Sequence, residues 1–221
     1  WWPADLHVIG KGIIRFHAVY WPAFLKSAGL ELPKQLFVHG YFTVEGQKMS
    51  KTLGNVIDPF DLVDKHGVEA VRYYLLRYTS ITEDSNISEE KLRVAYTADL
   101  ANGLGNLVSR VAKLCEQNNL VATPGPNVWC TGLEVALSGF RFNETLTIIW
   151  ELISEADKRI NDEKPWELKG DKFNVVLAEL IKRIQAIAYN LRPFLPETSE
   201  RILAQFSGQI KSTPPLFPRL L

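Results

Sequence analysis

The spacing of apolar residues changes once along this 221-residue chain, near residue 95. Before that point, short apolar runs alternate with glycine and proline, a pattern that is typical of mixed α/β structure. After it, apolar residues recur at helical spacing over long stretches separated by short loops. Long amphipathic helices joined by short loops favour an antiparallel bundle. We therefore predict an α/β region followed by an all-α region.

In the α/β region, a strand, a glycine turn and a helix follow one another, as in the first half of a βαβ unit. The turn is Gly10-Lys11-Gly12, and Gly29 is the expected end of the helix. Asp58-Pro59 has the residue types of a helix cap and first helical position. The elements expected here are strands at 6–9, 36–38 and 41–44, a helix at 13–28, a polar loop at 45–55, and a helix ending near Tyr78.

In the all-α region, prolines and glycines interrupt the helical periodicity at several places. Residues 121–131 contain two prolines and a glycine and are expected to form a loop. The expected helices are 88–118, 132–138, 142–163, 171–191 and 196–206.

Composition excludes several classes of protein. Lys+Arg and Asp+Glu both number 25, so the chain has no histone-like basic coat, although a few placed side chains could still bind nucleic acid. Two cysteines cannot build a disulfide framework or a four-ligand zinc site, and no metal site is expected. No apolar run approaches the roughly 20 residues that span a bilayer, so no membrane partner is expected.

The segment Lys48-Met49-Ser50-Lys51-Thr52 has the chemistry of a phosphate-binding loop. Two lysines three residues apart, with hydroxyl residues between and beside them, can follow a polyphosphate as compact point charges. They would stabilise negative charge that develops in a transition state. From composition alone, a solvated surface loop is the simpler interpretation.

This segment and its flank resemble the KMSKS signature of class I aminoacyl-tRNA synthetases. Further segments are similar to the methionyl-tRNA synthetase version of that fold, and they occur in the family's order: 7–17, 21–23, 39–41 and 67–74. The resemblance is densest up to about residue 110. It implies that residues 1–40 end a Rossmann-type catalytic domain, 41–95 form a connective region with the KMSKS loop, and 96–221 form a helical anticodon-binding domain.

The resemblance implies a two-step reaction. The intact enzyme would activate methionine with ATP and Mg²⁺, release pyrophosphate, and transfer the amino acid to tRNA(Met). Lys48 and Lys51 match the lysines that neutralise the ATP phosphates, and Ser50 lies between them. Gly10 and Gly12 match the nucleotide-binding turn. The family mostly has an aspartate at position 12, in contact with the ribose, and Gly12 lacks that hydrogen bond.

Two further groups of residues match family binding positions. Ile13 and His17 correspond to the methionine pocket and share a helix face at i, i+4 spacing. Asn106, Arg110 and Trp166 correspond to residues that read the CAU anticodon. Asn and Arg can hydrogen-bond base edges, and an exposed indole can stack on a base. Without the motif context, a core histidine, a polar helix face and a tryptophan capping the bundle core are the simpler interpretations.

The chain begins with Trp1 rather than Met, and it has no HIGH motif or zinc-knuckle cysteines. We therefore expect a C-terminal fragment that cannot form methionyl-adenylate alone, because charge-stabilising groups act as a preorganised set. Cytoplasmic location is expected, with an organelle not distinguished, and oligomeric state is not specified. Two alternatives stay open: a leucine, isoleucine or valine enzyme of the same class, and a non-catalytic helical module that binds tRNA or protein.

Overall fold

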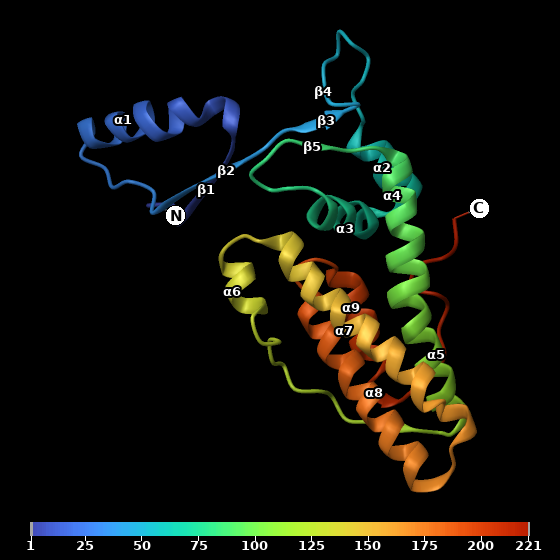
Figure 1. Ribbon diagram of the computed structural model, residues 1–221. Helices are drawn as coiled ribbons and strands as arrows, with labels where there is room; N and C mark the ends of the chain where they lie inside the picture. The colour runs from blue at the N-terminus through green and yellow to red at the C-terminus, as the bar shows by residue number, and fades with distance from the viewer. Residues whose placement is uncertain (1, 221) are drawn as a thin grey trace. The chain divides into compact units, whose positions relative to one another are not determined.

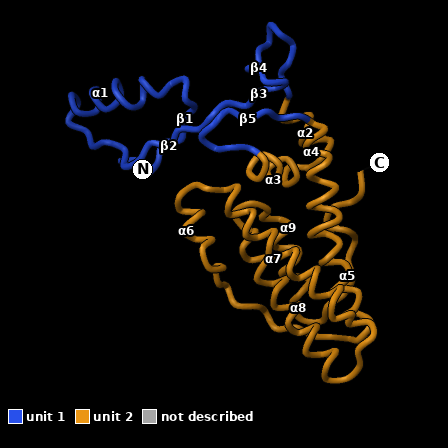
Figure 2. Tube along the Cα trace, viewed as in Figure 1, with its two compact units in different colours: residues 1–57, 79–88 blue, residues 58–78, 89–221 orange. Residues whose placement is uncertain are grey.

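The computed structural model describes residues 2–220 and divides into two compact units. The first unit extends up to Ile57 and includes Thr79–Ser88. The second contains Asp58–Tyr78 and everything from Glu89 onward (Figure 2). These units group residues by internal contacts, and the division into functional parts at residues 40 and 95 remains a prediction.

A βαβ unit opens the first unit. Strand β1 (Leu6–Gly10) pairs in parallel with β2 (Gln35–His39), and helix α1 (Trp21–Ser27) lies in the connection between them (Figure 1). A 3₁₀ turn at Lys11–Ile13 and a π-helical turn at Phe16–Tyr20 precede α1. Parallel pairing needs such a crossover connection, so the predicted strand, turn and helix are confirmed.

A small second sheet follows, in which β3 (Phe42–Val44) lies between β4 (Gln47–Lys48) and β5 (Ser85–Asn86). The prediction of a loop at 45–55 was wrong at Gln47–Lys48, which form strand β4 after a two-residue hairpin turn at Glu45 and Gly46. Both turn residues have positive φ, as such hairpins require. A two-residue strand is too short to show an alternating pattern in the sequence.

Two helices begin the second unit. Asp58 caps α2 (Pro59–His66) as predicted, since its carboxylate accepts a hydrogen bond of 2.8 Å from the Phe60 N–H. Gly67 has a φ of 85°, which ends α2 and lets α3 (Val68–Tyr78) start in a new direction.

The helical bundle forms the rest of the second unit. A long helix runs through α4 (Glu89–Ala95), a π-helical segment (Tyr96–Gly105) and α5 (Asn106–Gln117). The remaining α-helices are α6 (Leu133–Ser138), α7 (Phe142–Glu163), α8 (Gly170–Leu191) and α9 (Pro196–Gln205). A 3₁₀ turn at Pro165–Glu167 lies between α7 and α8, which Figure 1 shows side by side.

Two side chains of α3 bind residues at, and just before, the start of α9. The Glu69 carboxylate accepts hydrogen bonds from the N–H groups of Glu197 and Thr198, at 2.7 and 3.0 Å. The Arg72 guanidinium donates to the carbonyl oxygens of Pro193 and Phe194. The Glu69 contacts satisfy two N–H groups that the first turn of a helix leaves without partners. A short pairing of β6 (Val121–Ala122) with β7 (Gly208–Gln209), which the sequence did not predict, joins two loops.

Candidate functional site

The lysine loop folds around one asparagine. Asn55 Oδ1 accepts a hydrogen bond of 2.8 Å from the Ser50 N–H, and its Nδ2 donates to the Lys48 carbonyl at 3.4 Å. Gly54, with a φ of 67°, closes the turn by donating to the Ser50 carbonyl. Lys51 lies exposed on this turn. Sequence reasoning did not single out Asn55, which sets the shape of the loop.

The structure places Lys48 and Lys11, a residue of the turn that follows β1, against the same tyrosine ring. The Lys48 Nζ lies 4.5 Å from the centre of the Tyr41 ring, and the Lys11 Nζ lies 5.2 Å from the same centre. Lys11 also forms an ion pair of 2.6 Å with Asp84. The Lys11 ammonium and the Tyr41 N–H, which donate to the Asp84 carboxylate, lower the pKa of that group. We call Lys11, Tyr41, Lys48 and Asp84 the Tyr41 cluster.

Gly12 is packed against this cluster. A Cβ atom at position 12 would collide with the Tyr41 hydroxyl. An aspartate, the residue that the family usually has here, would therefore require Tyr41 to move. The position of the Tyr41 side chain therefore favours glycine at position 12 over the aspartate that is usual in the family.

Ile13 and His17 lie on one face of the helical connection after β1. The His17 Nδ1 lies 3.1 Å from the Ile13 carbonyl oxygen, so Nδ1 carries the hydrogen and donates it. The ring of His17 lies 6.2 Å from that of His7, and Ile13 is half exposed. These side chains leave an apolar and aromatic surface that the described part of the first unit does not cover.

Arg110 and Trp166 meet on the bundle. The Arg110 guanidinium donates to Asp157 Oδ1 at 2.9 Å and to Asn161 Oδ1 at 2.7 Å, and its Cζ lies 6.0 Å from the Trp166 ring centre. Trp166 is 52% exposed, so its ring is available for stacking. Asn106 lies exposed one helical turn before Arg110. Sequence reasoning missed Asp157 and Asn161, whose partner lies about fifty residues away along the chain.

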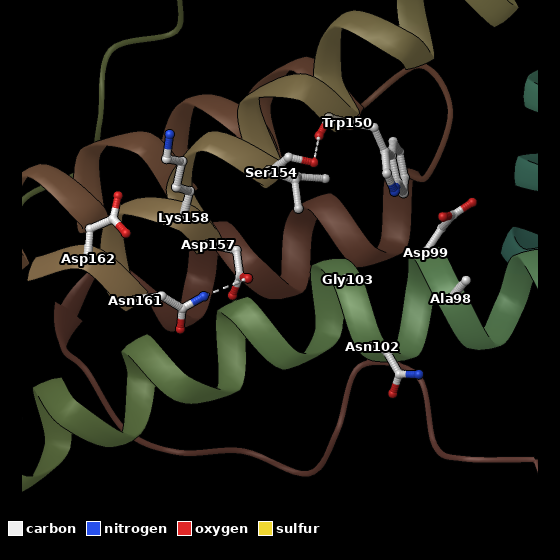
Figure 3. Close-up of a pocket in the computed structure, with 11 residues that line it drawn as sticks. Ala98, Asp99, Asn102, Gly103, Trp150, Ser154, Asp157, Lys158, Asn161 and Asp162 are labelled. Atoms are coloured by element: carbon white, nitrogen blue, oxygen red, sulfur yellow. Dashed lines mark hydrogen bonds between the residues drawn. The ribbon is translucent and has the colours of Figure 1, made fainter. Parts of the chain in front are cut away.

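A groove of about 510 Å³ lies between the π-helical segment and α7 (Figure 3). Asp157 and Asn161 lie on its wall, joined by a hydrogen bond of 3.1 Å, so the wall includes both side chains that accept from Arg110. The buried Trp150 Nε1 also lines it and has no hydrogen-bond partner among the described residues. Donors and acceptors therefore lie together on this face of the bundle.

Asp99, on the same groove, binds two tyrosines. Tyr73 and Tyr78 both donate their hydroxyls to Asp99 Oδ2, and the Tyr73 ring stacks on Trp150 at 4.4 Å. Burial, with help from the Asp99 contact, raises the pKa of Tyr78 to about 12 and that of Tyr73 further. Both phenols are neutral hydrogen-bond donors at neutral pH.

Two kinds of feature are absent from residues 2–220. No group of three or more His, Cys, Asp or Glu side chains is arranged to hold a metal ion. No helix in the same part of the chain is long and apolar enough to cross a membrane.

Comparison with known proteins identifies the class. The family described as "tRNA synthetases class I (M)" matches residues 1–112, about half of the chain. The chain belongs to this family, as the KMSKS-like segment and its flanking motifs led us to expect.

Several proteins similar to this chain are named as enzymes that attach methionine to tRNA. The methionine–tRNA ligase of Thermotoga maritima is 38% identical over 96% of this chain and 36% of its own length. That of Rhizobium meliloti is 40% identical over 91% of the chain and 42% of its own length. A methionyl-tRNA synthetase from Mycobacterium tuberculosis, solved with methionyl-adenylate, has a TM-score of 0.82 at 34% identity, over 99% of this chain and half of that one. The chain thus spans half or less of these proteins.

Proposed function

We propose that this chain is the part of a methionine–tRNA ligase that carries the phosphate-binding lysine loop and the anticodon-reading helices. The observation that carries the proposal is that Lys48 lies against the same Tyr41 ring as Lys11, a residue of the Gly10–Gly12 turn where β1 leads into a helix. Exposed N–H groups at such a turn suit a nucleotide, and two ammonium groups nearby suit its phosphates.

In the proposed reaction, the methionine carboxylate attacks the α-phosphorus of ATP and pyrophosphate leaves. Lys48 and Lys51 neutralise the charge that develops on the leaving group. The ribose hydroxyl at the 3′ end of tRNA(Met) then attacks the adenylate carbonyl, and AMP leaves. Magnesium would be bound by phosphate oxygens, which suits a cation that keeps several waters and takes few protein ligands.

Substrate positions follow the family match. Gly10, Gly12 and Ser50 would contact ATP, and Ile13 with His17 would line the methionine pocket. The uncovered apolar surface around Ile13 supports this arrangement, because a thioether side chain needs apolar walls. We infer that the chain by itself does not form the adenylate, and that the whole enzyme acts in the cytoplasm.

The helical bundle would read the CAU anticodon. Trp166 would stack on a base, and Asn106 and Arg110 would bind base edges or a phosphate. The exposed indole beside a guanidinium that is already oriented by Asp157 and Asn161 supports this role.

Binding of anticodon stem-loops tests the RNA role. The chain is titrated with a CAU stem-loop and with single-base variants, as wild type and as Trp166→Ala. We expect a clear preference for CAU and a loss of about 1–3 kcal/mol on removal of the indole. Trp2→Ala is the matched control, because Trp2 is an exposed tryptophan of the first unit.

Each other outcome points to an alternative. Preference for a different anticodon would keep the synthetase class and reject methionine in favour of a leucine, isoleucine or valine enzyme. Absence of any preference would support a non-catalytic interaction module. Methionine-dependent pyrophosphate exchange by the purified chain would contradict the expected inactivity in adenylation.

A further inference from the structure

The ring of Tyr41 is close to two lysines from different segments. Lys11 belongs to the turn after β1, and Lys48 belongs to the β3–β4 hairpin. The ring centre is 4.5 Å from the Lys48 Nζ and 5.2 Å from the Lys11 Nζ. An aromatic ring attracts an ammonium group that lies within about 6 Å of its centre. Tyr41 therefore contacts both cations at once.

The tyrosine itself is held at several points. Its N–H donates to Asp84 Oδ1 at 2.7 Å, and its carbonyl accepts from the Ser85 N–H at 2.9 Å. Its hydroxyl occupies the space beside Gly12 that a Cβ atom would fill. The backbone of Tyr41 is thus held by Asp84 and Ser85, and its hydroxyl lies against the turn after β1.

The ring of Tyr41 restricts the positions of the two lysine ammonium groups. A lysine ammonium sits on a flexible four-carbon chain that loses rotamer freedom when it binds a ligand. Two such groups also repel each other, which the face of the ring and the Asp84 carboxylate offset. A lysine that is already placed loses less entropy on meeting a phosphate.

We propose that Tyr41 is a positioning residue that holds the Lys48 ammonium in place for a polyphosphate before the ligand arrives. The proposal rests on the proposed phosphate role of Lys48. It assigns to the ring of Tyr41, rather than to its hydroxyl, the main effect on phosphate affinity.

Two substitutions separate the ring from the hydroxyl. Tyr41→Phe keeps the ring and removes the hydroxyl, whereas Tyr41→Leu removes the ring and keeps an apolar side chain. Inorganic tripolyphosphate is the probe, because it has the phosphates of ATP without its base and ribose. Affinity is measured by calorimetric titration of the full chain.

Nuclear magnetic resonance reports the position of Lys48 directly. In the wild type without ligand, the ε-methylene protons of Lys48 should be shifted upfield by the ring current of Tyr41. We expect Phe to keep this shift and Leu to abolish it. We also expect Leu to weaken tripolyphosphate binding about three- to fivefold, the equivalent of one exposed cation–π contact, and Phe to change it less than twofold.

Controls separate positioning from folding and from the proposed function. Hydrogen exchange of the Ser85 and Ile87 amides, which donate to the carbonyls of Tyr41 and Thr43, shows whether the pairing of β3 with β5 is intact in each variant. Lys48→Met should lose affinity, and Lys26→Met, an exposed lysine of α1, should not.

The inference is wrong if Tyr41→Leu, with the sheet intact, binds tripolyphosphate as tightly as the wild type or keeps the Lys48 shift. If Tyr41→Leu gives that result but Lys48→Met weakens tripolyphosphate binding, Lys48 binds phosphate without help from Tyr41. If Lys48→Met leaves binding unchanged, the phosphate role and the inference both fail.

Discussion

The two units of this chain bury their apolar residues very differently. Among described residues of the first unit, only Ile9, Leu25 and Ile87 are buried hydrophobic side chains, and most of the helical connection after β1 stays exposed. The second unit contains the rest of the buried apolar core, including Leu107, Leu146 and Leu177 with no exposure. The proposed phosphate site therefore lies on a unit with little core, and the proposed RNA site on a unit that is closely packed.

This contrast indicates where each site gets its precision. In the bundle, packed helices fix the positions of Arg110 and Trp166. In the first unit, polar contacts position the site residues instead: Asn55 binds the Ser50 N–H in the lysine loop, and Asp84 forms an ion pair with Lys11. Substitutions of buried core residues should therefore reveal the difference in packing most clearly, through the free energy of unfolding.

The largest effect is expected from Leu177→Ala in α8. Leu177 is fully buried, so its removal leaves a cavity and should lower the free energy of unfolding by about 2–5 kcal/mol. Val175→Ala, two residues earlier and 58% exposed, is the control and should cost little. Urea denaturation followed by far-ultraviolet circular dichroism measures both. Equal losses would contradict the view that the bundle core is closely packed.

Glu69→Ala tests the polar link between α3 and α9. The substitution removes the acceptor for two backbone N–H groups at the start of α9 and should cost about 1–3 kcal/mol. The same denaturation measurement applies, with the exposed Glu90→Ala as control. A loss no larger than that of the control would mean that water replaces the carboxylate without cost.

The sequence predicted features that depend on neighbours along the chain. The Asp58 cap and the helix at 142–163 were confirmed, because caps and periodicity are local signals. Strands of two residues, such as β4 and β6, were missed because they are too short to show a period.

Among the candidate site residues, too, those in local motifs could be predicted and those brought in by tertiary contacts could not. The motif context identified Lys48 and Arg110, whereas their partners Tyr41 and Asn161 depend on tertiary placement. No local pattern marks Asn161 as a partner of Arg110, because fifty residues of loop and helix separate them. The roles of all these residues stay predictions.

Asn161→Ala tests whether such a partner matters for RNA. Arg110 would keep its contact with Asp157 but lose the hydrogen bond to Asn161, so its guanidinium would be less well oriented. We expect CAU stem-loop binding to weaken by about 0.5–1.5 kcal/mol, with little change in unfolding. Asn143→Ala, near the other end of α7, is the matched control. Unchanged RNA binding would show that Asp157 alone orients Arg110.

The smallest effect is expected from the phenol of Tyr78. Its pKa rises from 10.0 to about 12, first through burial and then through its hydrogen bond to Asp99. The folded state therefore holds the proton more tightly than the unfolded state. The resulting contribution to stability is complete below pH 10 and disappears as the pH rises from 10 toward 12.

Absorbance at 295 nm during alkaline titration measures this ionisation, and Tyr78→Phe identifies the residue. In the wild type, one phenol should titrate near pH 12, and this component should be missing in the variant. The variant should also lose less stability between pH 10 and 12. Titration of Tyr78 near pH 10 would show that the Asp99 contact is open in solution, and the groove wall beside Trp150 would then be less ordered than the bundle core beneath it.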